Sequence, residues 1–333
     1  MVDADAEDHH GGGRTPAPPR SRFVSNLPSD PSCLDMKNRS FPIRLLRPSV
    51  VADPQQSTLN RTVDAKARAI VEGIMNDVRE RGKKAVMEHA LRLGDIQEGE
   101  PLIIDKAGLR AAFDSLSRAE QLTLERTAAR IGIFAEAQRA SLKDVSDIAV
   151  PGGQAGQLVA PVEVAGCYAP GGRYPLPSSV LMGAVTARVA GVKTVWVASP
   201  HPHPCVLAAA HLAGADGLLA VGGAQAIAAF AYGAGQVPVC DAIVGPGNKF
   251  VTAAKSLVAG SVAIDMLAGP SECLVVADHT ADPEVVAADL LAQSEHDVAA
   301  RAILVTPSAA LVEKVVAAII AQLATLPTAD TAR

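Results

Sequence analysis

Two kinds of hydrophobic pattern divide the chain. Apolar residues recur at helical spacing over residues 60–93 and again over 117–142, which predicts two long amphipathic helices. Ser117 and Glu120 have the spacing of a capping box, so the second helix is expected to begin there. Between the helices, residues 101–105 (PLIID) have the composition of a short strand. The first half of the chain is therefore expected to be mainly helical.

After Pro151 the pattern changes to short apolar runs separated by helical stretches. Runs that alternate with helices at this spacing favour a parallel sheet with helices on both faces, which is an α/β fold. Alanine-rich helices let helix and sheet approach closely. The predicted strands lie at residues 158–168, 193–198, 217–221, 242–244, 273–277 and 302–305.

Composition narrows the class of ligand. The chain is 49% hydrophobic and 20% charged, which is typical of a globular protein. Aromatic residues make up only 3%, so platforms for stacking nucleobases are not expected. The net charge is −5 and there is no long basic run, which argues against nucleic acid or an anionic membrane as partner. A small-molecule substrate fits better.

The first residues and the cysteines indicate the compartment. Residues 1–40 are rich in Asp, Gly, Pro and Ser without apolar periodicity, so we expect a disordered extension. Five dispersed cysteines without a Cys-x-x-Cys pair are typical of reduced thiols, and no apolar run is long enough for a membrane span. The expected location is cytoplasmic. The Arg and Ser content of residues 14–25 leaves an organelle address open, and Met36 is a candidate alternative start.

Glycine-rich loops adjoin four of the predicted strands. Ligands of parallel sheets bind at the carboxyl ends of the strands, and glycine lets a bulky ligand meet bare backbone amides. A tight turn explains any one loop, but four such loops favour a ligand with a pyrophosphate group. The Gly-x-Gly-x-x-Gly fingerprint is absent, so spacing alone does not establish dinucleotide binding. The loops contain Gly171 and Gly172, Gly222 and Gly223, Gly245 and Gly247, and Gly269.

A helix that starts at Asp282 and Pro283 carries half of a metal site. It is expected to run to about His296, which places Asp289, Gln293 and His296 on one face. Gln293 and His296 are spaced so that both side chains can coordinate one small cation. A solvated helix end is the alternative, because a lone Gln-x-x-His is a weak signal.

The remaining cysteines and histidines favour structural roles. Cys167 and Cys273 are candidate nucleophiles for an aldehyde intermediate, but free cysteine more often fills a strand as a small apolar residue. His201 and His203 alternate with proline, which indicates an exposed loop rather than a metal site. His89 lies among apolar residues and is expected at a helix surface or the edge of a core.

Five motifs in order resemble histidinol dehydrogenase, over about residue 41 to the end. That family is zinc-dependent and homodimeric, and it oxidises L-histidinol through L-histidinal to L-histidine with two NAD⁺, the last step of histidine biosynthesis. The motifs are YAPGGRYPLPSSVLM (168–182), VGGAQAIAAFAYG (221–233), VGPGNKFVTAAK (244–255), IDMLAGPSE (264–272) and AADLLAQSEHD (287–297).

The resemblance assigns roles and domains. It implies a nucleotide-binding-like domain at 161–270, inserted in a larger α/β domain made of 41–160 and 271–333. The implied NAD contacts are Tyr168, Gln225 and Asn248; Ser271 is expected to touch the substrate; the implied zinc ligands, which also lie near the substrate, are Gln293 and His296.

One difference between this sequence and the family affects the activity that we expect of this chain. The family continues past the position of Arg333 with a Glu-His pair that serves as base and acid, then an Asp and a partner-subunit His that complete the zinc sphere. Loss of a general base typically costs about 10²–10⁴ in rate, so a truncated chain is expected to be inactive or nearly so. Asp289, Glu295 and Asp297 are less favoured substitute ligands. The alternatives are a dehydrogenase of another small alcohol, such as a sulfonated diol, and a non-catalytic nucleotide-binding fragment.

Overall fold

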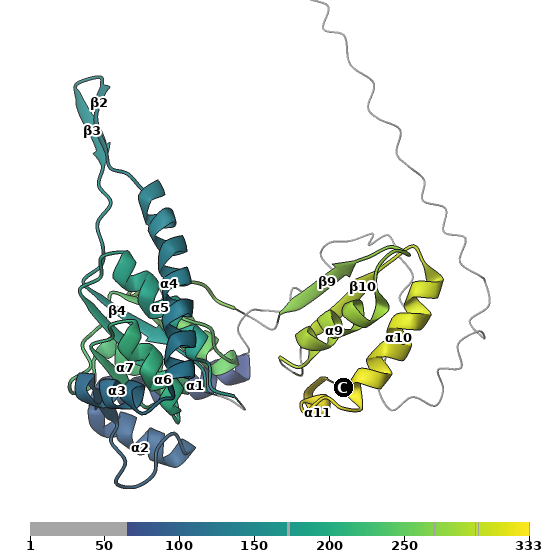
Figure 1. The fold of residues 1–333 in the computed structure, drawn as a ribbon. Coiled ribbons are helices and arrows are strands. Elements are labelled where there is room, and N and C mark those ends of the chain that lie inside the picture. Colours follow the sequence, from purple (N-terminus) through teal and green to yellow (C-terminus); the bar gives the residue numbers. More distant parts are fainter. Residues whose placement is uncertain (1–64, 172–173, 269–270, 297, 299, 333) are drawn as a thin grey trace, which may run out of the picture. The chain divides into compact units, whose positions relative to one another are not determined.

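The computed structural model describes residues 65–332, except 172–173, 269–270, 297 and 299 (Figure 1). They form two compact units, each described by itself. The larger unit is the described part of Ser49–Gly269, and the smaller unit is the described part of Pro270–Arg333. The extension expected at 1–40 and the candidate start at Met36 lie outside the described residues.

The larger unit is built on a six-stranded sheet in the order β1-β6-β5-β4-β7-β8. All neighbours pair in parallel except β1, which is antiparallel to β6 at the edge. From β4 the chain winds outward to β5 and β6, then returns to place β7 on the other side of β4. The strands are β1 Ile103–Asp105, β4 Val164–Tyr168, β5 Thr194–Ala198, β6 Gly217–Leu219, β7 Ala242–Val244 and β8 Ala263–Ile264.

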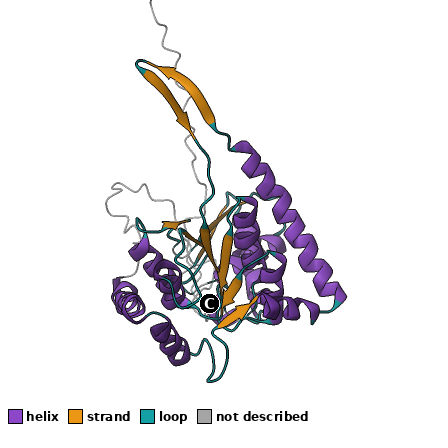
Figure 2. Ribbon diagram, turned by 90° about the vertical axis from the view of Figure 1, so that its left-hand side faces the viewer, coloured by secondary structure: helices purple, strands orange, loops and turns teal. Residues whose placement is uncertain are grey.

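Helices cover both faces of this sheet (Figure 2). Because crossovers between parallel strands are right-handed, the reversal at β4 sends the early and late helices to opposite faces. On one face α5 and α6 pack with α3 and α4; on the other α7 and α8 pack with α1, and α2 contacts α7. The helices are α1 Ala65–Arg81, α2 Lys83–Leu93, α3 Lys106–Asp114, α4 Arg118–Ser141, α5 Pro177–Val189, α6 Pro204–Leu212, α7 Gly223–Tyr232 and α8 Lys249–Val258.

Only one of the two predicted long helices forms as a single helix. The second is confirmed as α4, with both hydrogen bonds of the Ser117–Glu120 capping box present. The first, expected over 60–93, is broken into α1 and α2 at Gly82, whose φ of 56° lies outside the helical region. Asp77 bridges the break, since its carboxylate accepts hydrogen bonds from Arg81 at 2.6 Å and contacts His89 at 2.7 Å. His89 is thus a structural histidine.

The expected grouping of residues 41–160 with 271–333 is not the one that the structure has. Strand β1 completes the edge of the larger sheet, with Ile103 paired to Leu219. Helix α1 places its apolar stripe against α7 and α8. Residues 65–157 therefore belong to the same compact unit as the strands that follow, because pairing and apolar packing join them there.

A hairpin that the sequence pattern did not predict follows α4. Its strands, β2 Val145–Val150 and β3 Gly153–Gln157, are antiparallel, with a register shift between Val145 and Ile148. Every residue in both strands is exposed, and the hairpin projects from the rest of the unit in both views (Figures 1 and 2). Its apolar residues lack the strict alternation that marks a half-buried strand, which explains why the pattern missed it.

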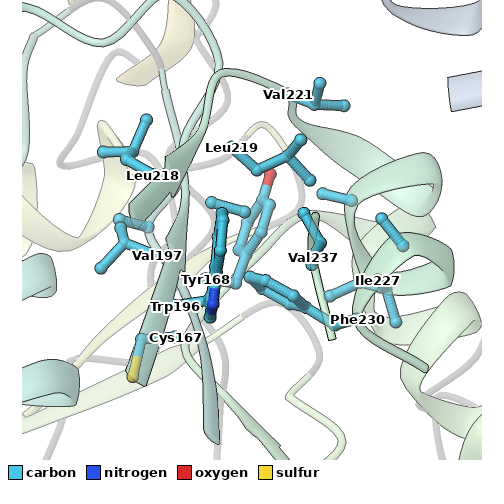
Figure 3. Packing of buried hydrophobic residues seen from close by; sticks show 14 of the residues in the cluster. Cys167, Tyr168, Trp196, Val197, Leu218, Leu219, Val221, Ile227, Phe230 and Val237 are labelled. Atoms are coloured by element: carbon cyan, nitrogen blue, oxygen red, sulfur yellow. The ribbon is translucent and has the colours of Figure 1, made fainter. Parts of the chain in front are cut away.

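Glycines in the strands make room for the few aromatic rings (Figure 3). A Cβ on Gly166 would lie 2.6 Å from Cδ2 of Phe230, and one on Gly217 would lie 2.8 Å from the Trp196 ring. Cys167 lies in the same core, where burial raises the pKa of its thiol to about 12. It is a packing residue and not a thiolate nucleophile.

The smaller unit is a strand-helix-strand unit with a further helix. Strands β9 Glu272–Val276 and β10 Arg301–Val305 pair in parallel, and α9 Pro283–Ser294 and α10 Ala309–Leu323 pack together with one face of them. A short helix, α11 Ala329–Ala332, follows. Both strands were predicted. The helix α9, expected to reach about His296, ends at Ser294, with Glu295 at its C-cap position.

Replacing Gly166 by alanine is expected to lower the free energy of unfolding by about 1–3 kcal/mol, since the added methyl group overpacks the ring of Phe230. Denaturant unfolding followed by circular dichroism measures this. Gly153→Ala is the matched control, because a Cβ there has no heavy atom within 4 Å. Equal losses for the two variants would contradict the packing described here.

Candidate functional site

The carboxyl ends of the parallel strands converge at the reversal of strand order. Tyr168 ends β4, and Gly245 follows β7 directly beside it. Gly222 and Gly223 follow β6, and Asp265 follows β8. In open α/β sheets the crevice for ligands lies at this reversal, outside the carboxyl ends of the strands. The glycine loops therefore lie where ligands of open α/β sheets bind.

Tyr168 supports the neighbouring loop from inside. It is 4% exposed, and its hydroxyl oxygen accepts a hydrogen bond from the backbone N–H of Gly223 at 3.1 Å. Burial raises the pKa of Tyr168 to about 12, so the phenol is neutral over the physiological range. Its ring lies beside Phe230 in the core (Figure 3).

Gln225 is held by a residue that sequence reasoning missed. It is 2% exposed, and its Nε2 donates to Oδ2 of Asp95 at 2.7 Å. The same oxygen accepts from the backbone N–H of Gly222 at 3.0 Å. Asp95 lies more than a hundred residues away along the chain, so no local pattern connects it with this loop. The contact expected between Gln225 and NAD stays a prediction.

Asn248 sits at the start of α8. Its Oδ1 accepts hydrogen bonds from the backbone N–H groups of Phe250 at 3.0 Å and Val251 at 3.2 Å, so it is the N-cap. The side chain is exposed. The amino end of a helix carries a partial positive charge, which attracts phosphate.

Three of the described glycines at this edge, Gly171, Gly222 and Gly247, have a reason within the protein, whereas Gly172 and Gly269 lie outside the described residues. A Cβ on Gly171 or Gly222 would meet the ring of Pro200, at 2.6 and 2.8 Å. A Cβ on Gly247 would lie 2.4 Å from Val251. The glycine pattern is therefore explained by close internal packing, and it is the location of the loops at the strand reversal that indicates a ligand.

Lys255 and Asp265 are two further residues that sequence reasoning did not single out. Lys255 is buried on α8, and its Nζ donates to the backbone oxygen of Gly245 at 2.9 Å and to Oδ1 of Asp265. The sequence offered two signals for them: Lys255 stands among apolar residues after Asn248, and Asp265 directly follows a short apolar run.

In the smaller unit, Ser271 and Gln293 come together. Nε2 of Gln293 donates to the backbone oxygen of Ser271 at 3.1 Å, which joins the end of α9 to the start of β9. The exposed His296 lies past the helix, but its N–H donates to the backbone oxygen of Gln293 at 3.3 Å, so the two stay within one turn.

The described residues do not form a complete zinc site. No group of three or more His, Cys, Asp or Glu side chains that suits a metal ion occurs among them. Of the substitute ligands, Glu295 accepts a 2.5 Å hydrogen bond from the hydroxyl of Thr328, Asp289 is exposed, and Asp297 lies outside the described residues. Gln293 and His296 together provide fewer donors than the three protein ligands that zinc normally has.

The other candidates have structural positions. Cys273 is half-buried in β9 and carries a free thiol. His203 caps α6 through its ring nitrogen, and His201 is exposed. None of the helices in the described part of the chain is both long and apolar enough to span a bilayer.

Comparison with known proteins places this arrangement in a family. The family described as histidinol dehydrogenase matches residues 58–333. Histidinol dehydrogenase of Parasynechococcus marenigrum is 43% identical over 298 residues, covering 87% of this chain and 68% of the relative. That of Thermus thermophilus is 47% identical over 274 residues, covering 81% and 64%.

A solved structure from the same family has a similar fold. The crystal structure of histidinol dehydrogenase from Elizabethkingia anophelis superposes with a TM-score of 0.72 at 32% identity, covering 80% of this chain and 62% of that one. The chain thus spans about two thirds of the length of the relatives that it matches. The family match, the sequence identity and the shared fold together mean that this chain belongs to the histidinol dehydrogenase family.

Proposed function

We propose that this protein oxidises L-histidinol to L-histidine through L-histidinal, with two NAD⁺ as hydride acceptors, and that the larger unit binds the nucleotide. The observation that carries the nucleotide assignment is the convergence of the loops after β6 and β7 beside Tyr168, at the reversal of strand order. Family membership supports the substrate. The protein is proposed to act as a homodimer, as the resemblance implies.

The larger unit's residues have a binding role in this proposal. Gln225 and Tyr168 fix the loop that begins at Gly222, and Asn248 presents the amino end of α8. These groups would hold the dinucleotide, and NAD⁺ would supply the hydride acceptor for each of the two oxidations. Each oxidation would also release a proton, and hydration of the aldehyde by water between them would let the second oxidation give the carboxylate.

Ser271, Gln293 and His296 are proposed to hold the substrate, with zinc keeping the imidazole and amino groups in place. The hydrogen bond between Gln293 and the backbone of Ser271 supports a shared location for two of these residues. Because the described residues lack a complete metal site, no proton or hydride step is assigned to the metal.

NADH formation from L-histidinol is the primary test. With NAD⁺ and zinc, the chain is expected to bind NAD⁺ and to form NADH slowly or not at all, because its described residues do not complete a zinc site. Absorbance at the NADH band measures the reaction, and a thermal shift measures binding. A sulfonated propanediol is the matched substrate control. More NADH from that alcohol would overturn the histidinol assignment. Binding of NAD⁺ with neither NADH formation nor a thermal shift on adding histidinol would favour a nucleotide-binding module.

Two variants at Asn248 separate its capping role from cofactor contact. Asn248→Ala is expected to lower the free energy of unfolding by about 1 kcal/mol, because the cap is lost. Asn248→Asp retains the capping oxygen but replaces the amide donor with a negative charge. It is expected to keep the stability while its affinity for NAD⁺ falls. Ser308→Ala, which removes the cap of α10, is the control and should weaken stability alone. Unchanged affinity in Asn248→Asp would remove Asn248 from the site.

Zinc binding tests the proposed ligands. The chain is expected to bind zinc weakly, and His296→Ala should abolish this binding by removing its imidazole donor. Calorimetric titration with zinc provides the measurement. His279→Ala is the control, because this exposed histidine lies in the same unit outside the proposed site. One tightly held ion per chain after dialysis, or equal effects of the two variants, would contradict the assignment.

A further inference from the structure

Lys255 is a buried cation with a definite orientation. Its side chain is 4% exposed, on a face of α8 that also buries Val251, Ala254 and Val258. Lysine is almost never fully buried unless it is paired. Here Nζ donates to the backbone oxygen of Gly245 and to the carboxylate of Asp265. The ammonium group is thus directed toward the loop that precedes its own helix.

Asp265 binds the backbone N–H of the same glycine. Its Oδ2 accepts a hydrogen bond from the backbone N–H of Gly245 at 2.8 Å, and its Oδ1 accepts one from Met266 at 2.7 Å. The N–H of Gly245 therefore donates to one member of the ion pair, while the C=O of Gly245 accepts from the other. Both peptide groups that flank this glycine are fixed in orientation.

The carboxylate of the pair is charged in the folded protein. Burial alone would raise the pKa of Asp265, but hydrogen bonds from Lys255, Gly245 and Met266 lower it below its usual value. The carboxylate is therefore ionised at neutral pH. Removing the charge of Asp265 would leave the buried side chain of Lys255 without its ionic partner.

Gly245 has little freedom to respond. Its φ is 124°, and a Cβ at this position would lie 2.0 Å from the backbone oxygen of Tyr168. The loop 245–248 therefore starts against the end of β4, at the reversal of strand order, and leads directly to the cap of α8. Whatever fixes Gly245 also fixes where that helix presents its amino end.

We propose that Lys255 and Asp265 are a positioning pair for the nucleotide site: by holding both peptide groups of Gly245, they set the loop 245–248 and the amino end of α8 in the geometry that receives the pyrophosphate of NAD⁺. The pair itself does not touch the nucleotide. This inference rests on the proposed function of the larger unit.

The test compares nucleotide affinity with local and global stability in Lys255→Met and Asp265→Asn. Each variant is expected to raise the Kd for NAD⁺ about tenfold or more, since small displacements of a binding loop weaken its contacts. Hydrogen exchange of the Gly245 amide, measured by NMR, is expected to quicken in both. The double variant should bind NAD⁺ no more weakly than Lys255→Met does, because the two residues act as one unit.

A second ion pair, which is half-buried, provides the control. Arg188 and Asp216 are 2.7 Å apart, and Asp216 accepts from the N–H of Val195 at the start of β5, the opposite end of the same sheet. Arg188→Met and Asp216→Asn should reduce the melting temperature and quicken exchange at Val195. They should leave exchange at Gly245 and the Kd for NAD⁺ unchanged.

The outcomes separate the inference from the proposed function. If the wild-type chain does not bind NAD⁺, the proposed function fails and so does the assignment of this pair to a nucleotide site. If the wild type binds but the pair's variants keep its Kd and its exchange at Gly245, the positioning role is overturned. If Lys255→Met does not fold, Asp265→Asn decides, because it preserves the shape of the side chain.

Discussion

The parallel pairing of β4 with β7 is the interaction on which the larger unit depends. It forces the chain, after winding outward through β5 and β6, to return across the sheet by way of α7. That return sends α7 and α8 to the face opposite α5 and α6 and leaves the strand ends open at β4 and β7. The contact of Gly245 with the backbone of Tyr168 lies at this opening. The candidate site is a consequence of the pairing.

Two carboxylates, those of Asp95 and Asp265, hold the loops at that opening. Asp95 accepts from the Gly222 amide and from Gln225, and Asp265 accepts from the Gly245 amide and pairs with Lys255. Each hydrogen bond from a backbone N–H satisfies a donor that would otherwise lie poorly solvated at the end of a strand. The loops are thereby ordered before any ligand arrives, which reduces the entropy lost on binding.

Glycine is needed at two kinds of position in this protein, inside strands and in loops. Gly166 and Gly217 admit aromatic rings, whereas Gly222 and Gly245 allow loops to pack on Pro200 and on backbone. From the sequence alone, only the loop glycines have the appearance of ligand-binding residues. Internal packing explains them all, so the evidence for a ligand comes from where the loops lie in the sheet and from membership of the histidinol dehydrogenase family.

The sequence by itself determined the α/β class, the capping box of α4, the strands of the smaller unit and the family, because these depend on local periodicity and on linear motifs. Tertiary structure alone decided the break at Gly82, the entry of β1 into the larger sheet, and the partners of Gln225 and Gly245. The conformation of one glycine and contacts between distant residues determine these features. No local pattern records which carboxylate meets which amide once the chain has folded.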